Sequence, residues 1–275
     1  MLKKLGGKVF EKLAASASVH REARAFLEAP NPPEDAVKRR LPFYLRSKSW
    51  QVRNIGVKLI AKLRDPSFYP ILIQKVRNCS DTGIVTRNSI ASIRRLGLNG
   101  PEVEQGLRRA LSAHYWEIRC EAAGALSQLF EPSPERTALL VGALKPRPNR
   151  EAPQVFGEQN VEVRAAVAVA LGAVDSPRIT MPALMLLAND PHWLVRHQAA
   201  VALVELSRTH GELIPQVGAA LDGIDILSDG CRSEFPFPRT MAALRRILRN
   251  GRSDMEPEVV RRLYIDMKRG WNRRK

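Results

Sequence analysis

The apolar residues of this 275-residue chain recur at helical spacing over most of its middle. After Arg196, alanine or leucine stands at positions 199, 200, 203 and 206, and after Arg119 the same residue types stand at 122, 123, 126 and 129. Spacings of three and four residues place these side chains on one face of a helix. Proline or glycine follows each run, and a second apolar run comes next. The pattern therefore predicts units of helix, turn and helix, which bury their apolar faces by stacking.

A short motif opens the first helix of each predicted unit. In three copies Val or Ile follows a tryptophan by two positions and an arginine follows it by three: Trp50/Val52/Arg53, Trp116/Ile118/Arg119 and Trp193/Val195/Arg196. A fourth copy keeps Val163 and Arg164, and a weaker one keeps Val85 and Arg87. From Arg53 to Arg196 the successive intervals between arginines are 34, 32, 45 and 32 residues. Intervals of this size predict a solenoid.

These segments, among them "DPHWLVRHQAAVALVEL", resemble the first helix of a HEAT repeat, in the shorter form found in the bilin-lyase-like HEAT family. The resemblance covers roughly residues 47–222. It implies an all-α fold, a right-handed α-solenoid of about five HEAT-like helical hairpins with helical caps. It also implies that Arg53, Arg119, Arg164 and Arg196 pack along the stack and bond polar groups of adjacent turns. We expect this structural role for the arginines and tryptophans rather than a ligand role.

Breaks in the pattern divide the chain into three predicted parts. Residues 1–46 are expected to form a basic helical cap, residues 47–223 the HEAT-like repeats, and residues 224–275 a basic helical cap and tail. The 45-residue interval contains "KPRPNREAPQVFGEQN", whose three prolines predict an inserted loop at 145–160.

The positive charge is concentrated at both ends of the chain. The net charge is +16, of which residues 1–77 carry +11, residues 78–231 carry −3 and residues 232–275 carry +8. Basic ends attract polyanions such as nucleic acid, anionic lipid or acidic protein surfaces. A protein that binds nucleic acid along all its repeats would carry Arg and Lys throughout, which this chain does not.

Two basic clusters have aromatic residues among them, "VKRRLPFYLRSKSW" and "MKRGWNRRK". Arginine with aromatic side chains can bind phosphates and stack on bases, although a solvated solenoid end has the same composition. The candidate partner-binding residues are Lys38, Arg39, Arg40, Arg46, Lys48, Arg108, Arg109, Arg245, Arg246, Arg249, Lys268, Arg269, Trp271, Arg273, Arg274 and Lys275.

The sequence offers little for metal or catalytic chemistry. Cys79, Cys120 and Cys231 lie far apart without a C-x-x-C pair, and the five histidines form no ligand spacing with them. We therefore expect no metal and no cofactor, and a reducing, cytoplasmic location. No apolar run is long enough to span a membrane, although the amphipathic start of the chain could contact anionic lipid. No P-loop, G-x-S-x-G, H-E-x-x-H or dinucleotide-binding motif is present.

These observations predict a non-catalytic scaffold or adaptor, not an enzyme, that presents a curved surface to a macromolecular partner, most simply a protein. One alternative is a nucleic-acid-binding solenoid that uses its basic ends. A further alternative, suggested by the family resemblance alone, is a HEAT-like DNA glycosylase or a chromophore-lyase-type helper. The sequence does not specify an oligomeric state.

Overall fold

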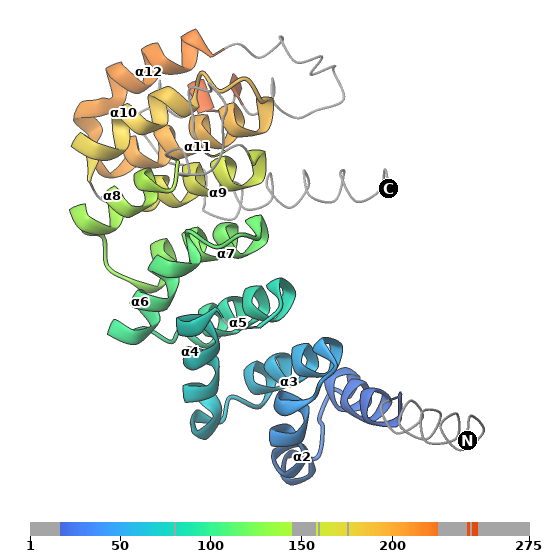
Figure 1. Cartoon of the computed structure of the whole chain (residues 1–275). Coiled ribbons are helices and arrows are strands. Elements are labelled where there is room, and N and C mark those ends of the chain that lie inside the picture. The colour runs from blue at the N-terminus through green and yellow to red at the C-terminus, as the bar shows by residue number, and fades with distance from the viewer. Residues whose placement is uncertain are drawn as a thin grey trace. The chain divides into compact units, whose positions relative to one another are not determined.

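A computed structural model describes residues 17–79, 81–144, 158, 160–174, 176–224, 241–242 and 244–246. Every regular element of these ranges is a helix, which confirms the all-α prediction (Figure 1). Residues 17–28 are helical and precede α2 (Glu34–Arg46). Five helical hairpins follow: α3 (Trp50–Leu63) and α4 (Tyr69–Asn78), α5 (Gly83–Leu96) and α6 (Pro101–Ala110), α7 (Trp116–Leu129) and α8 (Pro134–Gly142), α9 (Val161–Gly172) and α10 (Pro177–Leu187), and α11 (Trp193–Thr209) and α12 (Ile214–Gly223).

The helix boundaries follow from local chemistry. Ser49 and Asn160 cap α3 and α9, where their side chains accept hydrogen bonds from Val52 N and Val163 N. The second helix of each hairpin carries proline at its first or second position, where the missing N–H costs no helical hydrogen bond. Gly97 ends α5 in the left-handed conformation, with φ of 70°, which glycine adopts without strain. The breakers in the sequence therefore separate the helices as expected.

The chain divides into two compact units, residues 1–125 and 126–275, with the division inside α7. In the first unit α3 packs against α2 and α5, and α4 packs against α5 and α6. In the second unit α11 packs against α9, α10 and α12. A Cβ atom on Gly172 of α9 would lie 2.8 Å from Cα of Ala202 in α11, so the glycine allows these two helices their close approach.

The apolar stripes form the core. Leu126 and Leu203, which occupy the same position in two copies of the repeat, are 1% and 0% exposed. Ala199 and Ala200 are fully buried, and so are Ala122 and Ala123 of the other copy. Small residues at these places bring neighbouring helices close together, which raises the density of van der Waals contacts. The prediction that these positions are core residues is therefore correct.

The three predicted parts of the chain remain a prediction. Helices α3 to α12 lie within residues 47–223. The predicted loop at 145–160 lies outside the described residues, apart from Glu158 and Asn160, and so does most of the predicted cap and tail at 224–275.

Candidate functional site

Four arginines hold the same position in their helices and share a main-chain contact. Each is the fourth residue of its helix: Arg53 in α3, Arg119 in α7, Arg164 in α9 and Arg196 in α11. In each, Nη1 donates to the carbonyl group six residues earlier, and in Arg53, Arg119 and Arg196 also to the one five residues earlier, as in Arg53 to Ser47 O (2.8 Å) and Lys48 O (2.9 Å). Arg196 repeats this with Asp190 O (2.8 Å) and Pro191 O (2.9 Å). We call this contact the arginine clamp.

The clamp also joins successive repeats through carboxylates. Arg53 donates from Nε and Nη2 to the carboxylate of Asp81, 28 residues further on, with a shortest distance of 2.6 Å. Arg164 donates in the same way to Asp190, 26 residues further on, at 2.6 and 2.9 Å. A bidentate arginine–carboxylate pair fixes both position and orientation. The structure therefore gives these arginines the structural role that the sequence predicted.

The electrostatics of Asp81 agree with this role. Burial alone would raise the pKa of its carboxyl. Hydrogen bonds from Arg53, Lys75 and the backbone N–H of Thr82 outweigh burial and hold the pKa well below its usual range. Asp81 is therefore ionised in the folded protein and attracts both cations.

Arg87, which stands in the weaker copy of the motif, does not belong to the clamp. It is the fifth residue of α5 and is exposed. The fourth residue is Thr86, fully buried, whose hydroxyl donates to Asp81 O over 3.4 Å. Thr86 stands 33 residues after Arg53 and 33 before Arg119, so the repeat is more regular than the arginines alone indicate. The next loop, 111–115, contains no Asp or Glu, as expected where no guanidinium needs a carboxylate partner.

The surface recess with the clearest chemical character lies in the first unit, between the faces of α3 and α5. Its volume is about 410 Å³, and it is lined by Leu27, Lys58, Ala61, Lys62, Asn88, Ala91, Ser92 and Arg95. Three of these side chains are cationic and none is a carboxylate. We call it the cationic recess.

The cations of the cationic recess are held in different ways. Lys62 donates to Leu27 O (2.8 Å) and to Ala29 O, at the C-terminal end of helix 17–28, which fixes its ammonium group. Lys58 and Arg95 are exposed, and neither makes an ion pair with any residue that the structure describes. Two donors are thus available to an anion, beside a third that is already oriented.

The remaining walls of the cationic recess are small or neutral. Ala61 and Ser92 are buried, and Ala91 is half-buried. Asn88 donates from Nδ2 to Asn54 Oδ1 over 2.6 Å, which aligns its amide across the two helices. An arrangement of apolar surface with a few polar groups is typical of small-molecule sites.

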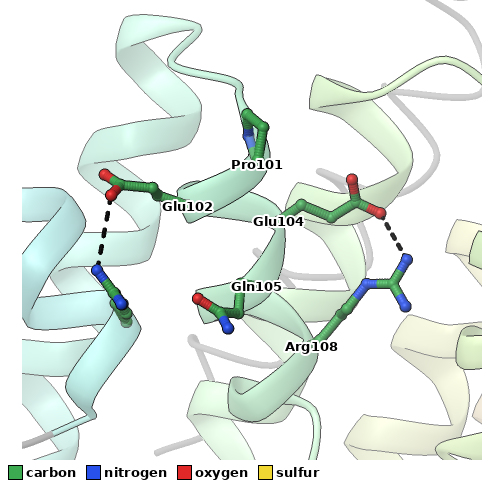
Figure 2. A pocket seen from close by; sticks show the side chains of 6 residues that line it. Pro101, Glu102, Glu104, Gln105 and Arg108 are labelled. Carbon is green, nitrogen blue, oxygen red and sulfur yellow. Dashed lines mark hydrogen bonds and ion pairs between the residues drawn. The ribbon is translucent and has the colours of Figure 1, made fainter.

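A second recess lies on the side formed by α4 and α6 (Figure 2). Its volume is about 460 Å³, and its charged lining residues pair with one another. Glu102 lies 3.6 Å from Arg77, and Glu104 lies 2.9 Å from Arg108. Since its charges are balanced internally, this recess has no preference for an anion or a cation.

Comparison with known proteins found a family model for one of these repeats. Residues 180–210 match the HEAT repeat family model. This segment contains all of α11, including the clamp residue Arg196. The chain therefore contains a HEAT repeat at these residues. A search of curated proteins found no match for it.

The HEAT-repeat protein is also similar to a solved structure, that of the complex of CpcE and CpcF of phycocyanin lyase from Nostoc sp. PCC7120. The identity is 19%, the TM-score is 0.49, and the similarity covers 85% of this chain and 93% of the other. That structure is a two-protein lyase complex. The activity named for that complex differs from two expectations from the sequence, that of a non-catalytic scaffold and that of a chain that is not an enzyme.

Two of the predicted partner-binding residues near residue 40 are neutralised within the HEAT-repeat protein. Lys38 pairs with Asp65 at 3.0 Å and with Glu34 at 3.6 Å. Arg40 makes a bidentate pair with Glu22 at 2.8 and 2.6 Å. By contrast Arg39, Arg46 and Lys48 are exposed. None of these three makes an ion pair within the part of the chain that the structure describes.

The other predicted residues are spread over the HEAT-repeat protein. Arg108 pairs with Glu104, Arg109 donates to Arg77 O over 3.3 Å, Arg245 pairs with Asp222 at 3.1 Å, and Arg246 is exposed. Those outside the described residues are Arg249, Lys268, Arg269, Trp271, Arg273, Arg274 and Lys275. No described helix is both long enough and apolar enough to span a membrane.

The cationic recess is not among the sites predicted from the sequence. Lys58 and Arg95 lie 37 residues apart and meet only because α3 packs against α5. The spacing of the lining residues does indicate a shared surface. Positions 58, 61 and 62 lie on one face of α3, and positions 88, 91, 92 and 95 lie on one face of α5. Charge patterns along the chain do not reveal the recess, because its three cations come from two helices that are separate in the sequence.

Proposed function

We propose that this HEAT-repeat protein holds a carboxylate-bearing chromophore in the cationic recess, as a lyase-type helper that presents the chromophore to an acceptor protein. The observation that carries the proposal is the lining of the recess, with Lys58, Lys62 and Arg95 and no carboxylate. A chromophore is the candidate anion because the repeat sequences resemble those of the bilin-lyase-like HEAT family. At 19% identity and a TM-score of 0.49, that similarity adds no support of its own.

The chemistry of the cationic recess favours an organic anion. Arginine and lysine donate charge-assisted hydrogen bonds to carboxylates, and arginine can do so with two parallel bonds. Leu27, Ala61 and Ala91 offer apolar surface beside these donors. The volume of about 410 Å³ lies within the range of about 300–1,000 Å³ that small-molecule sites occupy. A conjugated, mostly apolar body with acidic side chains would satisfy both kinds of surface.

The binding step can be tested with biliverdin, an open-chain tetrapyrrole with two propionate groups, by its absorbance change on titration. The double variant Lys58→Gln, Arg95→Gln should weaken binding by about two- to thirtyfold, since exposed ion pairs contribute roughly 0.2–1 kcal/mol each. Arg87→Gln is the matched control, because it removes an exposed arginine from the same helix as Arg95 but outside the recess. Equal loss in the control and the double variant would contradict the proposal.

The helper role needs its own test. The chain is mixed with biliverdin and an apo-phycocyanin acceptor, and pigment bound covalently to the acceptor is detected by its fluorescence with zinc after denaturing electrophoresis. We expect more covalent pigment with the parent chain than without it, and less with the double variant. If the chain binds biliverdin but leaves the amount of covalent pigment unchanged, the helper role is wrong.

A further inference from the structure

One stretch of the first unit has positive charge and no acidic residue. From Ala36 to Arg64 the sequence contains nine Lys and Arg residues and no Asp or Glu. The stretch runs through α2 and α3. Carboxylates from elsewhere neutralise Lys38, Arg40 and Arg53, through Asp65, Glu22 and Asp81. Only some of the nine basic residues in this stretch therefore remain as unneutralised charges on the surface.

The unneutralised charges of α2 surround an exposed aromatic ring. Phe43 is 65% exposed, although a phenylalanine is usually buried. Arg39 lies four residues before it and Arg46 three residues after it, so all three share one face of α2. The guanidinium of Arg40 lies 5.6 Å from the centre of the Phe43 ring, a cation–π contact that orients the ring.

The same alternation continues into the next helix. Lys48 is exposed in the turn after α2, and Trp50, the first residue of α3, is 39% exposed. We call Arg39, Phe43, Arg46, Lys48 and Trp50 the aromatic–basic stripe. The stripe shares no residue with the cationic recess. An inference about it is therefore independent of the proposed chromophore site.

We propose that the aromatic–basic stripe binds single-stranded nucleic acid, with Phe43 and Trp50 as stacking platforms for bases and Arg39, Arg46 and Lys48 as partners of the phosphates. Bases and phosphates alternate along a single strand, as aromatic rings and cations alternate along the stripe. In a duplex the bases are stacked on one another and offer no free face to Phe43. An anionic membrane also attracts basic residues with aromatic rings, and it is the competing outcome of the test below.

Fluorescence anisotropy with a labelled 12-nucleotide oligo(U) and oligo(dT) tests this inference. The parent should bind, and the logarithm of its affinity should fall with the logarithm of the salt concentration by about 0.7 per phosphate contact. The triple variant Arg39→Gln, Arg46→Gln, Lys48→Gln should reduce this slope by about two. Arg87→Gln and Arg108→Gln together are the control, and should leave the slope unchanged.

Substitution of Phe43 separates stacking from general apolar contact. Phe43→Leu keeps the apolar surface and removes the ring, and should weaken oligonucleotide binding about fivefold or more, as loss of a stacked base does. Phe43→Trp should restore or strengthen binding. Since Phe43 is exposed, neither variant should change the thermal midpoint. The inference is overturned if the parent does not bind near 50 mM salt, if Phe43→Leu binds as the parent does, or if the stripe variants lose binding only to phosphatidylserine vesicles.

Discussion

Removal of the Asp190 carboxylate is a stringent perturbation of the arginine clamp. The side chains of Asp190 and Arg164 are 0% and 5% exposed, so Asp190→Ala leaves the Arg164 guanidinium buried without its carboxylate. Loss of one partner of a buried ion pair costs about 3–5 kcal/mol of the free energy of unfolding. The backbone N–H of His192 also loses an acceptor, at 2.8 Å in the parent, which places the expected loss toward the upper end of that range.

The assay is urea unfolding followed by far-UV circular dichroism and by tryptophan fluorescence. Glu28→Ala is the control, because the Arg24–Glu28 pair is 64% and 63% exposed and should contribute less than about 1 kcal/mol. The double variant Arg164→Leu, Asp190→Leu should be more stable than Asp190→Ala, since it leaves no buried charge without a partner. If Asp190→Ala costs no more than Glu28→Ala, the clamp does not join the repeats as we describe.

Two further predictions concern the packing of the core and the dependence of stability on pH. Leu126→Ala and Leu203→Ala should each lower the free energy of unfolding by about 2–5 kcal/mol in urea melts, and a loss below about 1 kcal/mol would mean that these side chains are not packed. Burial lowers the pKa of His197 to about 4, so the folded protein holds this side chain neutral while the unfolded chain takes up a proton near pH 6.5. Stability from this group is therefore complete above about pH 6.5 and falls as the pH drops toward 4, by about 2 kcal/mol at pH 5. Urea melts of the parent and of His197→Gln between pH 7 and 5 measure how the free energy of unfolding changes with pH. The same change in the variant as in the parent would refute the assignment.

The repeat frame could be predicted from the sequence because it depends on local patterns. A Val–Arg or Ile–Arg pair before an apolar stripe identified four clamp residues, each of which is the fourth residue of its helix. The weaker copy is out of register by one residue at Arg87, which follows Val85 by two positions instead of one. Buried Thr86 fills that position, and its short hydroxyl side chain gives no charge signal in the sequence.

The candidate sites were less predictable because they depend on contacts between distant residues. The partners of Lys38 and Arg40 are Asp65 and Glu22, which lie 27 and 18 residues away. Only the folded chain shows that these two charges are neutralised while Arg39 and Arg46 are not. The cationic recess likewise exists only through the packing of α3 against α5. Sequence patterns within one helix therefore predict the stacked helices. Contacts between helices determine which charged side chains are neutralised and which stay exposed.

The central claim, that the cationic recess holds an organic anion by its carboxylates, is tested most directly by titrating the parent chain with biliverdin and with its dimethyl ester. Esterification removes both negative charges and keeps the conjugated body. Lys58, Lys62 and Arg95 can donate charge-assisted hydrogen bonds to the carboxylates of the acid, which the ester lacks. The account predicts that the acid binds at least about threefold more tightly than the ester, and that 0.5 M salt reduces the difference, since exposed pairs are screened. Equal affinity for the two compounds would contradict it.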